Sequence, residues 1–400
     1  MNRKVIRREK YIQQIKPFIG KDIIKVITGQ RRVGKSYFLL MVSEEIRKKY
    51  PDANFIFINK ELHEFENIRT YTDLLQFVKS KSKKDTTNFL FIDEVQEIEN
   101  FEKALRELIL RENFDVYVTG SNSRILSGDL ATLLSGRYIE IKIFSLTYPE
   151  FLKFHNIDPG RESLNLYLKY GGMPYLKNLE LSDEVVFDYL KSIYNSIILR
   201  DVVERRNIRN VHFLNTLVNY VGDNIGNPLS AKKISDFLNS QRIKMSVVSI
   251  MNYLKFLEDA YFIHRVKRLD LHGKKIFEIN DKFYFEDVGI RNALLGFGIE
   301  NIGGIIENIV FKHLLSEGYR VFVGKIGDRE IDFVAEKGGE RVYIQVCYML
   351  SDERVWKREF GNLLQIKDNY RKVVVSLDPI QFDSYKGIQH RRLEEFLMEF

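Results

Sequence analysis

Short apolar runs alternate with segments of helical length over the first 150 residues. Residues 22–28 (Asp-Ile-Ile-Lys-Val-Ile-Thr) are predicted to form a short buried strand, and residues 37–49 are predicted to form a helix after a glycine-bounded loop. Further apolar runs fall at 54–58, 89–92 and 115–119. Strands that alternate with helices predict crossover units and a parallel sheet, so the expected fold class is α/β.

The pattern changes after about residue 148. From there to 224 it is helical and rich in tyrosine, with a breaker cluster at Gly171-Gly172-Met173-Pro174. Residues 230–268 predict short helices followed by a strand, and the section from about 304 predicts helix, strand, strand, strand, helix, strand. No internal repeat and no low-complexity segment is present.

Composition narrows the class of protein. A chain of 400 residues with 44% apolar residues can build two or three cores and is neither disordered nor collagen-like. The only cysteine, Cys347, cannot form an intramolecular disulfide or a cysteine-rich zinc site, so we expect a reducing, cytoplasmic setting. No apolar run approaches the roughly 18 residues of a membrane span, and no apolar signal core follows the basic N-terminus. Membrane and secreted classes are excluded on this basis.

The net charge of +7 is unevenly distributed. Residues 1–50 contain 14 Lys/Arg against 4 Asp/Glu, and residues 241–275 contain 8 against 3. Such basic surfaces attract phosphate, either of a nucleotide or of a nucleic-acid backbone. For the first stretch a plain solvated face is an equally good interpretation.

The strongest motif lies between the first predicted strand and the first predicted helix. It fits G-x-x-x-x-G-K-[ST] in full, and its residues are Gly29, Gln30, Arg31, Arg32, Val33, Gly34, Lys35 and Ser36, with Tyr37 following. Glycines let the backbone turn its N–H groups inward as an anion nest at a helix N-terminus. Lys35 is expected to reach the β- and γ-phosphates of ATP, and the Ser36 hydroxyl is expected to ligate Mg²⁺.

A second element supports a nucleotide site. The apolar strand at 88–92 ends in Asp93 and Glu94, and the carboxyl end of a parallel strand faces the ligand crevice. We expect Asp93 to hold Mg²⁺ and Glu94 to polarise the attacking water.

Two further residues are candidates for the same chemistry. The third strand leads into Gly120-Ser121-Asn122-Ser123, where a polar side chain could sense the γ-phosphate or orient water. Asn122 is favoured over Ser121 for this role, and a plain turn is the alternative. Arg137 precedes the next strand, and an arginine there could stabilise transition-state charge in a neighbouring subunit. A structural salt bridge is an equal alternative for Arg137.

The phosphate loop, Phe-Ile-Asp-Glu-Val-Gln at 91–96 and Thr-Gly-Ser-Asn at 119–122 together resemble the AAA+ ATPases. Leu-Ser-Gly-Arg at 134–137, Tyr-Gly-Gly-Met-Pro at 170–174 and Arg-Asp-Val-Val at 200–203 are similar to a narrower prokaryotic AAA+ family with a C-terminal domain of unknown function. The similarity covers essentially the whole chain. It implies a P-loop NTPase (AAA+) parallel-sheet core at 1–147, a helical lid at 148–210, a winged helix at 211–290 and a restriction-endonuclease-like α/β domain at 291–400.

The winged-helix interpretation also has support in the residues themselves. A capped helix start at Ser230, a helical apolar pattern over 246–257 and a following strand predict a helix-turn-helix with a wing, which can enter a major groove of DNA. The candidate phosphate contacts are Lys244, Lys255, Arg265, Lys267 and Arg268. The alternative is a module that packs internally or binds protein.

The C-terminal section resembles the PD-(D/E)xK nuclease core, but incompletely. Glu307 matches the helical acid and Asp332 matches the strand Asp, whereas Gln345 stands at a carboxylate position and Cys347 at the lysine position. Those nucleases need two carboxylates for a divalent cation and a lysine for the attacking water. We therefore expect the fold without the cleavage activity, unless a migrated lysine such as Lys325 or Lys337 replaces the missing one.

Three functions follow from these residues. The first is an ATP-hydrolysing AAA+ switch or motor that acts on DNA through the winged helix. The second is an ATP-regulated, metal-dependent nuclease, and the third is a signalling or scaffold ATPase whose partner is a protein. A homo-oligomer in which Arg137 acts in trans is compatible with each of them.

Overall fold

The computed structural model describes residues 6–111, 113–123, 136–204, 206, 208, 210–271, 273, 276, 280–350, 353–379 and 384–399. The chain divides into two compact units. The first consists of residues up to Phe144 together with Asp259–Tyr261, and the second consists of Ser145–Glu258 and the chain from Phe262 onward.

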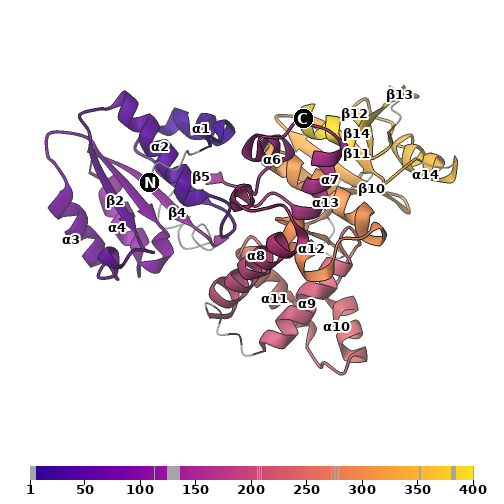
Figure 1. Cartoon of the computed structure of the whole chain (residues 1–400), viewed down its shortest axis with the longest axis horizontal. Coiled ribbons are helices and arrows are strands. Elements are labelled where there is room, and N and C mark those ends of the chain that lie inside the picture. The colour runs from indigo at the N-terminus through magenta and orange to yellow at the C-terminus, as the bar shows by residue number, and fades with distance from the viewer. Residues whose placement is uncertain are drawn as a thin grey trace. The chain divides into compact units, whose positions relative to one another are not determined.

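The first unit is a parallel α/β sheet (Figure 1). Its five strands run in the order β2-β3-β4-β1-β5, and every neighbouring pair is parallel. The strands are β1 (Ile24–Thr28), β2 (Asn54–Asn59), β3 (Asn88–Asp93), β4 (Phe114–Gly120) and β5 (Tyr138–Lys142). The predicted α/β alternation is therefore confirmed, and the order places β4 between β1 and β3.

Helices cover both faces of this sheet. One hydrophobic core forms against α1 (Glu9–Ile15) and α2 (Lys35–Lys49), and the other forms against α3 (Tyr71–Lys81) and α4 (Phe101–Ile109). Every residue of β1, β3 and β4 is buried, as expected for strands enclosed by helices on both sides. Short 3₁₀ turns lie at Lys16–Phe18, His63–Phe65 and Val95–Glu97.

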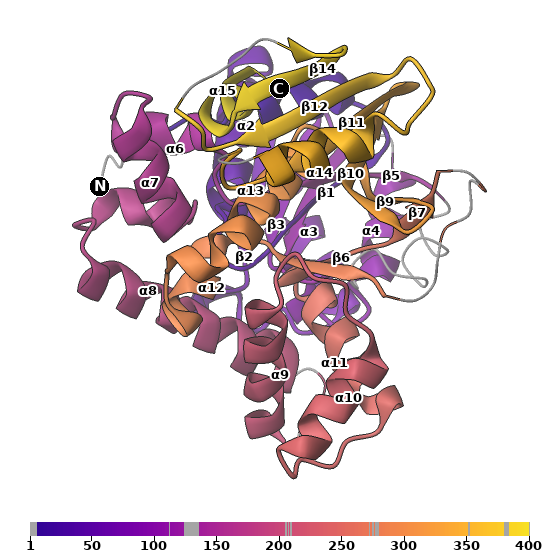
Figure 2. The same ribbon diagram turned by 90° about the vertical axis from the view of Figure 1, so that its right-hand side faces the viewer.

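The second unit begins with helices, as the pattern after residue 148 predicts. They are α6 (Tyr148–His155), α7 (Arg161–Tyr170), α8 (Asp183–Ser196), α9 (Val211–Asp223), α10 (Ala231–Ser240), α11 (Val247–Asp259) and α12 (Val288–Leu295). A 3₁₀ turn lies at Pro174–Asn178, and a π-helical stretch, Ile197–Glu204, follows α8. Figure 2 shows α9, α10 and α11 grouped together.

The glycine pair after α7 has a structural reason. The Gly172 N–H donates to Asp287 Oδ2 (2.8 Å), and the Gly172 carbonyl accepts from the Leu146 N–H (2.7 Å). A Cβ on Gly172 would lie 2.3 Å from the Leu146 carbonyl oxygen, so no larger residue fits without movement. The breaker cluster therefore joins the start of the second unit to the N-cap of α12.

A seven-stranded mixed sheet completes the second unit, in the order β13-β14-β12-β11-β10-β9-β7. Its strands are β7 (Arg268–Asp270), β9 (Arg320–Ile326), β10 (Arg329–Lys337), β11 (Glu340–Val346), β12 (Arg371–Ser376), β13 (Ser384–Tyr385) and β14 (Ile388–Arg392). Its helices are α13 (Ile302–Ser316), α14 (Glu353–Leu363) and α15 (Leu393–Glu399), and a 3₁₀ turn, Ile299–Asn301, precedes α13. The predicted succession from residue 304 is confirmed, with β13, β14 and α15 in addition.

A separate antiparallel pair, β6 (Ile263–Val266) and β8 (Lys282–Phe285), follows α11. Leu229 forms an isolated bridge with Asp281 at the start of β8. β7 lies between β6 and β8 in sequence but pairs in parallel with β9, so the segment after α11 contributes a strand to the C-terminal sheet. Among the described residues, no helix is long and apolar enough to cross a membrane.

Candidate nucleotide-binding site

The phosphate loop lies at the carboxyl end of β1 and leads directly into α2. Gly29 has φ +141°, and a Cβ there would lie 2.2 Å from the Ile143 carbonyl oxygen. Gly34 has φ +99° and occupies the N-cap of α2. Both glycines therefore meet a backbone requirement that larger residues would satisfy only with strain, and the loop ends at a helix N-terminus, where anions are stabilised.

Lys35 is held inside the loop. Its side chain is buried, and Nζ donates to the carbonyl oxygens of Gly29 and Gln30, each at 3.0 Å. The same ammonium lies 3.9 Å from Glu94 Oε1. The lysine is thus positioned between the loop and the acidic end of β3.

Asp93 and Glu94 lie at the carboxyl end of β3, as predicted. The Thr119 hydroxyl donates to Asp93 Oδ1, and Ser36 makes a side-chain hydrogen bond to the same carboxyl group. Burial raises the pKa of Asp93, against the opposing effect of these hydrogen bonds. The structure therefore brings together the two residues that were predicted to hold Mg²⁺, with their oxygens in direct contact.

Glu94 has the opposite electrostatic balance. Burial acts to raise its pKa, but Lys35, Gln96, Arg31 and Ser121 together hold that pKa below its usual value. The backbone at Glu94 is left-handed (φ 55°), and its N–H donates to Thr119 Oγ1 at 2.9 Å. This carboxylate is consequently kept ionised and firmly oriented.

The end of β4 supplies polar groups between β1 and β3. Ser121 is fully buried and its hydroxyl donates to Glu94 Oε2 at 3.2 Å, while Asn122 is buried beside it in sequence. The prediction from sequence preferred Asn122 to Ser121 and assigned no role to Thr119 or Gln96. Thr119 bonds to both Asp93 and Glu94, and Ser121 and Gln96 bond to Glu94. The available signal was their position, because Thr119 and Ser121 lie at the carboxyl end of β4 and Gln96 lies in the turn after β3.

The remaining loop residues divide by exposure. Val33 is fully buried, and Arg31 is nearly buried with its guanidinium 3.8 Å from Glu61. Arg32 (φ 71°) and Tyr37 are exposed. The Gln30 amide is buried, and both of its polar atoms lack a hydrogen-bond partner among the described residues.

Arg8 also contacts the phosphate loop. It lies in no sequence motif, so the sequence alone did not predict this role. It is buried, and Nη1 donates to the carbonyl oxygens of Val33 (3.2 Å) and Phe144 (2.9 Å). The Tyr11 ring lies 4.6 Å from the guanidinium, and the Tyr11 hydroxyl accepts hydrogen bonds from Arg8 Nη2 (3.3 Å) and from the Phe144 N–H (3.2 Å). One residue of the basic N-terminal stretch, Arg8, therefore stabilises the phosphate loop through a hydrogen bond to its backbone.

Arg137 lies at the other end of the sheet. β5 is parallel to β1 with Tyr138 opposite Ile24, and the Arg137 carbonyl accepts from the Ile24 N–H at 3.0 Å. The residue therefore precedes the amino end of the edge strand, whereas the phosphate loop follows the carboxyl end of β1. Its side chain is exposed.

The candidate DNA contacts fall into two groups. Lys244, Lys255 and Lys267 are exposed. Arg265 is also exposed and pairs with Asp281, and Arg268 Nη2 lies 3.9 Å from Glu330. Lys274 and Lys275, in the same basic stretch, lie outside the described residues.

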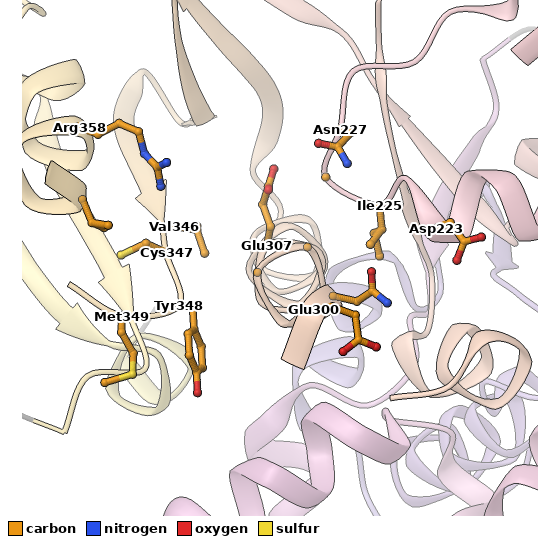
Figure 3. A pocket seen from close by; sticks show the side chains of 15 residues that line it. Asp223, Ile225, Asn227, Glu300, Glu307, Val346, Cys347, Tyr348, Met349 and Arg358 are labelled. Atoms are coloured by element: carbon orange, nitrogen blue, oxygen red, sulfur yellow. The ribbon is translucent and has the colours of Figure 1, made fainter. Parts of the chain in front are cut away.

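The four residues of the predicted C-terminal constellation do lie together. Gln345 Oε1 accepts from the Asp332 N–H at 3.4 Å, and Asp332 Oδ2 accepts from the Val346 N–H at 2.8 Å. Glu307 and Cys347 line one cavity of about 550 Å³, shown in Figure 3, and burial raises the pKa of the Cys347 thiol. The lysine that reaches Glu307 and Asp332 is Lys282 of β8, not Lys325 or Lys337.

Comparisons with known proteins agree with this geometry. Residues 21–152 match the family described as an AAA domain, and residues 161–301 match a domain of unknown function. The chain is 35% identical to an uncharacterized protein of Haemophilus influenzae over the full length of both chains. It is 35% identical to an uncharacterized protein of Methanocaldococcus jannaschii, covering 87% of this chain and 79% of that one.

A solved structure shares the fold at lower identity. It is a Walker-type ATPase of Pyrococcus abyssi, with a TM-score of 0.50 and 16% identity, over 72% of this chain and 95% of that one. Together with the phosphate loop and the acidic end of β3, these matches identify the architecture. The chain belongs to a prokaryotic family of AAA-domain P-loop ATPases that carry a second domain of unknown function.

Proposed function

We propose that the protein binds and hydrolyses ATP with Mg²⁺ and uses the reaction as a switch or motor. One observation carries this proposal: Lys35, Asp93 and Glu94 converge at the carboxyl edge of one parallel sheet. An anion nest, a buried ammonium and two adjacent carboxylates are the groups that phosphoryl transfer requires.

The residues present fit both ligands. The backbone N–H groups from Gly29 to Ser36 would hold the phosphates, and Lys35 would exchange its carbonyl contacts for phosphate oxygens. Ser36 and Asp93 offer the hard oxygen donors that Mg²⁺ prefers, and the ion would neutralise phosphate charge there. Glu94, kept ionised, would accept a proton from the attacking water while Ser121 fixes its orientation.

Two substitutions test the assignment of these groups. Lys35→Ala should abolish ATP binding or turnover, because it removes the only ammonium that the structure places within the loop. Glu94→Gln should keep ATP binding and lower kcat by about 100-fold or more. Lys48→Ala, an exposed lysine near the end of α2, is the matched control. Unchanged turnover in Lys35→Ala, or lost binding in Glu94→Gln, would refute the respective role.

We further propose that residues 211–290 act as a winged helix on DNA. The succession α9, the Leu229 bridge, α10, α11, β6 and β8 supports this proposal, since it is a three-helix module with a small antiparallel sheet. The exposed lysines at 244, 255 and 267 would contact phosphates. We also propose that the C-terminal sheet has a restriction-endonuclease-like fold. Its mixed parallel and antiparallel topology and its helices α13 and α14 support this proposal.

DNA action is tested by the ATPase rate with and without duplex DNA over a range of salt concentrations. Stimulation that falls steeply with salt supports the proposal, because phosphate contacts release counterions. The triple variant Lys244→Ala, Lys255→Ala, Lys267→Ala should lose this stimulation and keep the basal rate. Arg265 and Arg268 are left intact because their ion pairs make them poor probes.

A protein partner is the second candidate, and α11 gives it specific support. Val247, Val248 and Met251 are 39%, 67% and 53% exposed, so the helix that would enter a DNA groove presents apolar side chains. Exposed apolar side chains gathered on one helix are typical of protein contacts. Assembly that depends on ATP but not on DNA would favour this candidate, and Val248→Glu with Met251→Glu should then abolish it.

Nuclease activity is not part of the proposal. Gln345 and Cys347 lack the charges that the motif needs, and the carboxylates Glu307 and Asp332 are already paired with Lys282. We expect no nicking of plasmid DNA with Mg²⁺ or Mn²⁺. Nicking that disappears with Asp332→Ala would overturn this expectation.

A further inference from the structure

A buried lysine lies at the centre of the carboxylates in the C-terminal unit. Lys282, the first residue of β8, has only 2% of its side chain exposed. Its Nζ lies 2.7 Å from Glu307 Oε1, 2.8 Å from Glu330 Oε1 and 3.7 Å from Asp332 Oδ1. One ammonium therefore serves three carboxylates, which come from α13 and β10.

The local structure explains why these groups converge. Glu330 and Asp332 are two residues apart on β10, where the pairing with β9 shifts register between Ile331 and Val334, and both carboxylates face Lys282. Lys282 and Tyr284 have the same relation on β8, and both donate to Glu307 Oε1. The backbone of Gly226 approaches the other side of Glu307, where a Cβ would lie 2.7 Å from Oε2. The cluster is thus fixed by three elements and closed by a glycine.

The charges in this cluster indicate what the lysine does. Buried carboxylates without a cation are strongly destabilising, so such groups are paired or coordinate metals. Burial opposes the charge on Lys282, yet the three carboxylates raise its pKa above the usual value. Glu359, also nearby, has its own partner in Arg358 (Nε to Oε1, 2.7 Å). Within the described ranges, no group of three or more His, Cys, Asp or Glu is arranged to hold a metal ion.

We propose that the Lys282 ammonium is the resident cation of this carboxylate cluster, occupying the position that a divalent cation would take, and that its removal creates a divalent-cation site. The donors for that site are the oxygens of Glu307, Glu330 and Asp332, which suit Mg²⁺ or Mn²⁺. Of the three carboxylates, Glu307 also lines the cavity of Figure 3, together with Arg358. This proposal is independent of the ATPase proposal.

The test uses the full chain without nucleotide and Mn²⁺ as the probe. Lys282→Met keeps the length of the side chain and removes its charge, and Mn²⁺ binding is measured by electron paramagnetic resonance and calorimetry. We expect one additional Mn²⁺ site, at least about tenfold tighter than any Mn²⁺ binding in the unsubstituted protein. Adding Asp332→Asn to Lys282→Met should remove this site, because one of its three carboxylates is lost. Lys357→Met, which removes an exposed lysine paired with Glu353, should gain nothing.

A measurement of stability keeps the test decisive if Lys282→Met folds poorly. Mn²⁺ should then raise the Tm of Lys282→Met and leave that of Lys282→Met with Asp332→Asn unchanged, since a ligand stabilises only the state that binds it. The proposal fails if Lys282→Met neither binds Mn²⁺ nor is stabilised by it. It also fails if the unsubstituted protein binds Mn²⁺ in a manner that Asp332→Asn abolishes, because Lys282 would then accompany a metal ion rather than replace it.

Discussion

Two adjacent acids at the end of β3 have opposite electrostatic surroundings. Burial raises the pKa of Asp93, whereas Lys35 and three further polar residues hold the pKa of Glu94 below its usual value. The Lys35 ammonium, 3.9 Å from Glu94, contributes most to the stabilisation of that carboxylate, whereas for Asp93 the effect of burial prevails. Glu94 is stabilised as a carboxylate before any ligand binds, which suits a proton acceptor. Asp93 would gain a cation when the ligand binds, which suits a metal ligand.

The contact between Ser121 and Glu94 leads to a prediction about turnover. Ser121→Ala removes the hydroxyl that donates to Glu94 Oε2, and the freed carboxylate should sample orientations away from the attacking water. We expect kcat for ATP to fall by about tenfold with KM little changed, because the group acts on the chemical step. Steady-state ATPase kinetics provide the measurement.

The control for Ser121→Ala is Ser80→Ala, which removes an exposed hydroxyl bonded only to a backbone carbonyl in α3. Ser80→Ala should behave as the unsubstituted protein. Equal kcat values in Ser121→Ala and Ser80→Ala would mean that the hydroxyl does not orient Glu94.

At the scale of elements, the phosphate loop depends on a residue far from its motif. Arg8 precedes α1 and joins the Val33 carbonyl to the Phe144 carbonyl, so the loop and the segment after β5 share one buried guanidinium. The loop is consequently held by the N-terminal helix as well as by β1 and α2. The conformation of the phosphate loop therefore depends on α1, β1 and α2, all of which belong to the first unit.

Substitutions at Arg8 and at its neighbour Arg7 distinguish the role of the buried arginine from that of the exposed one. Arg8→Gln should lower the free energy of unfolding by about 1–3 kcal/mol, because two buried carbonyl groups lose a charged donor. It should also raise the KM for ATP through a looser loop. Arg7→Gln, which removes the ion pairs with Glu9 and Glu45 from a side chain that is 41% exposed, should change either quantity little. Thermal unfolding and ATPase kinetics on both variants distinguish them, and equal effects would contradict the role of Arg8.

Another element-scale prediction concerns pH. Burial lowers the pKa of His155, in the last turn of α6, from 6.5 to about 4, and its Nε2 lacks a partner among the described residues. The unfolded chain therefore binds a proton between pH 6.5 and about 4 that the folded chain does not, so stability should fall as pH falls through this window. Above pH 6.5 both states are neutral, and this contribution is constant.

The measurement is Tm as a function of pH for the unsubstituted protein and for His155→Phe, which keeps an apolar ring against Phe151. His155→Phe should lose less Tm between pH 6.5 and pH 4 than the unsubstituted protein. The exposed His63 provides a control, because His63→Phe should retain the original pH dependence. Identical curves for His155→Phe and the unsubstituted protein would show that His155 has the same pKa in the folded and the unfolded chain.

The sequence predicts elements and motifs well where the information is local. The runs at 22–28, 54–58, 89–92 and 115–119 became β1 to β4, and the phosphate loop lies between β1 and α2. What escapes prediction depends on distant partners. Lys282 belongs to no motif and lies 25 residues from Glu307, and Arg8 reaches a carbonyl 136 residues away. β7 pairs with β9 although β8, α12 and α13 lie between them in the sequence. Such contacts depend on tertiary packing, so the local sequence pattern does not predict them.

At the scale of the whole molecule, Arg137 raises the question of assembly. It precedes the amino end of β5, the edge strand, while the phosphate loop follows the carboxyl end of neighbouring β1. Five strand residues at about 3.3 Å each separate the two ends, too far for the side chain to reach the nucleotide of its own subunit. An exposed arginine in this place is well suited to the site of a second copy in a head-to-tail arrangement.

Mixing two inactive variants tests this arrangement. Arg137→Ala keeps an intact pocket and Lys35→Ala keeps an intact arginine, so a head-to-tail assembly of the two in equal amounts pairs both intact parts at about a quarter of its sites. ATPase activity should therefore recover to about a quarter of the unsubstituted rate, whereas each variant alone stays inactive. Native mass with a bound ATP analogue verifies that mixed assemblies form. Mixed assemblies without recovery at any ratio, or full activity of Arg137→Ala alone, would leave Arg137 as a surface residue, and the switch would then have to work within a single chain.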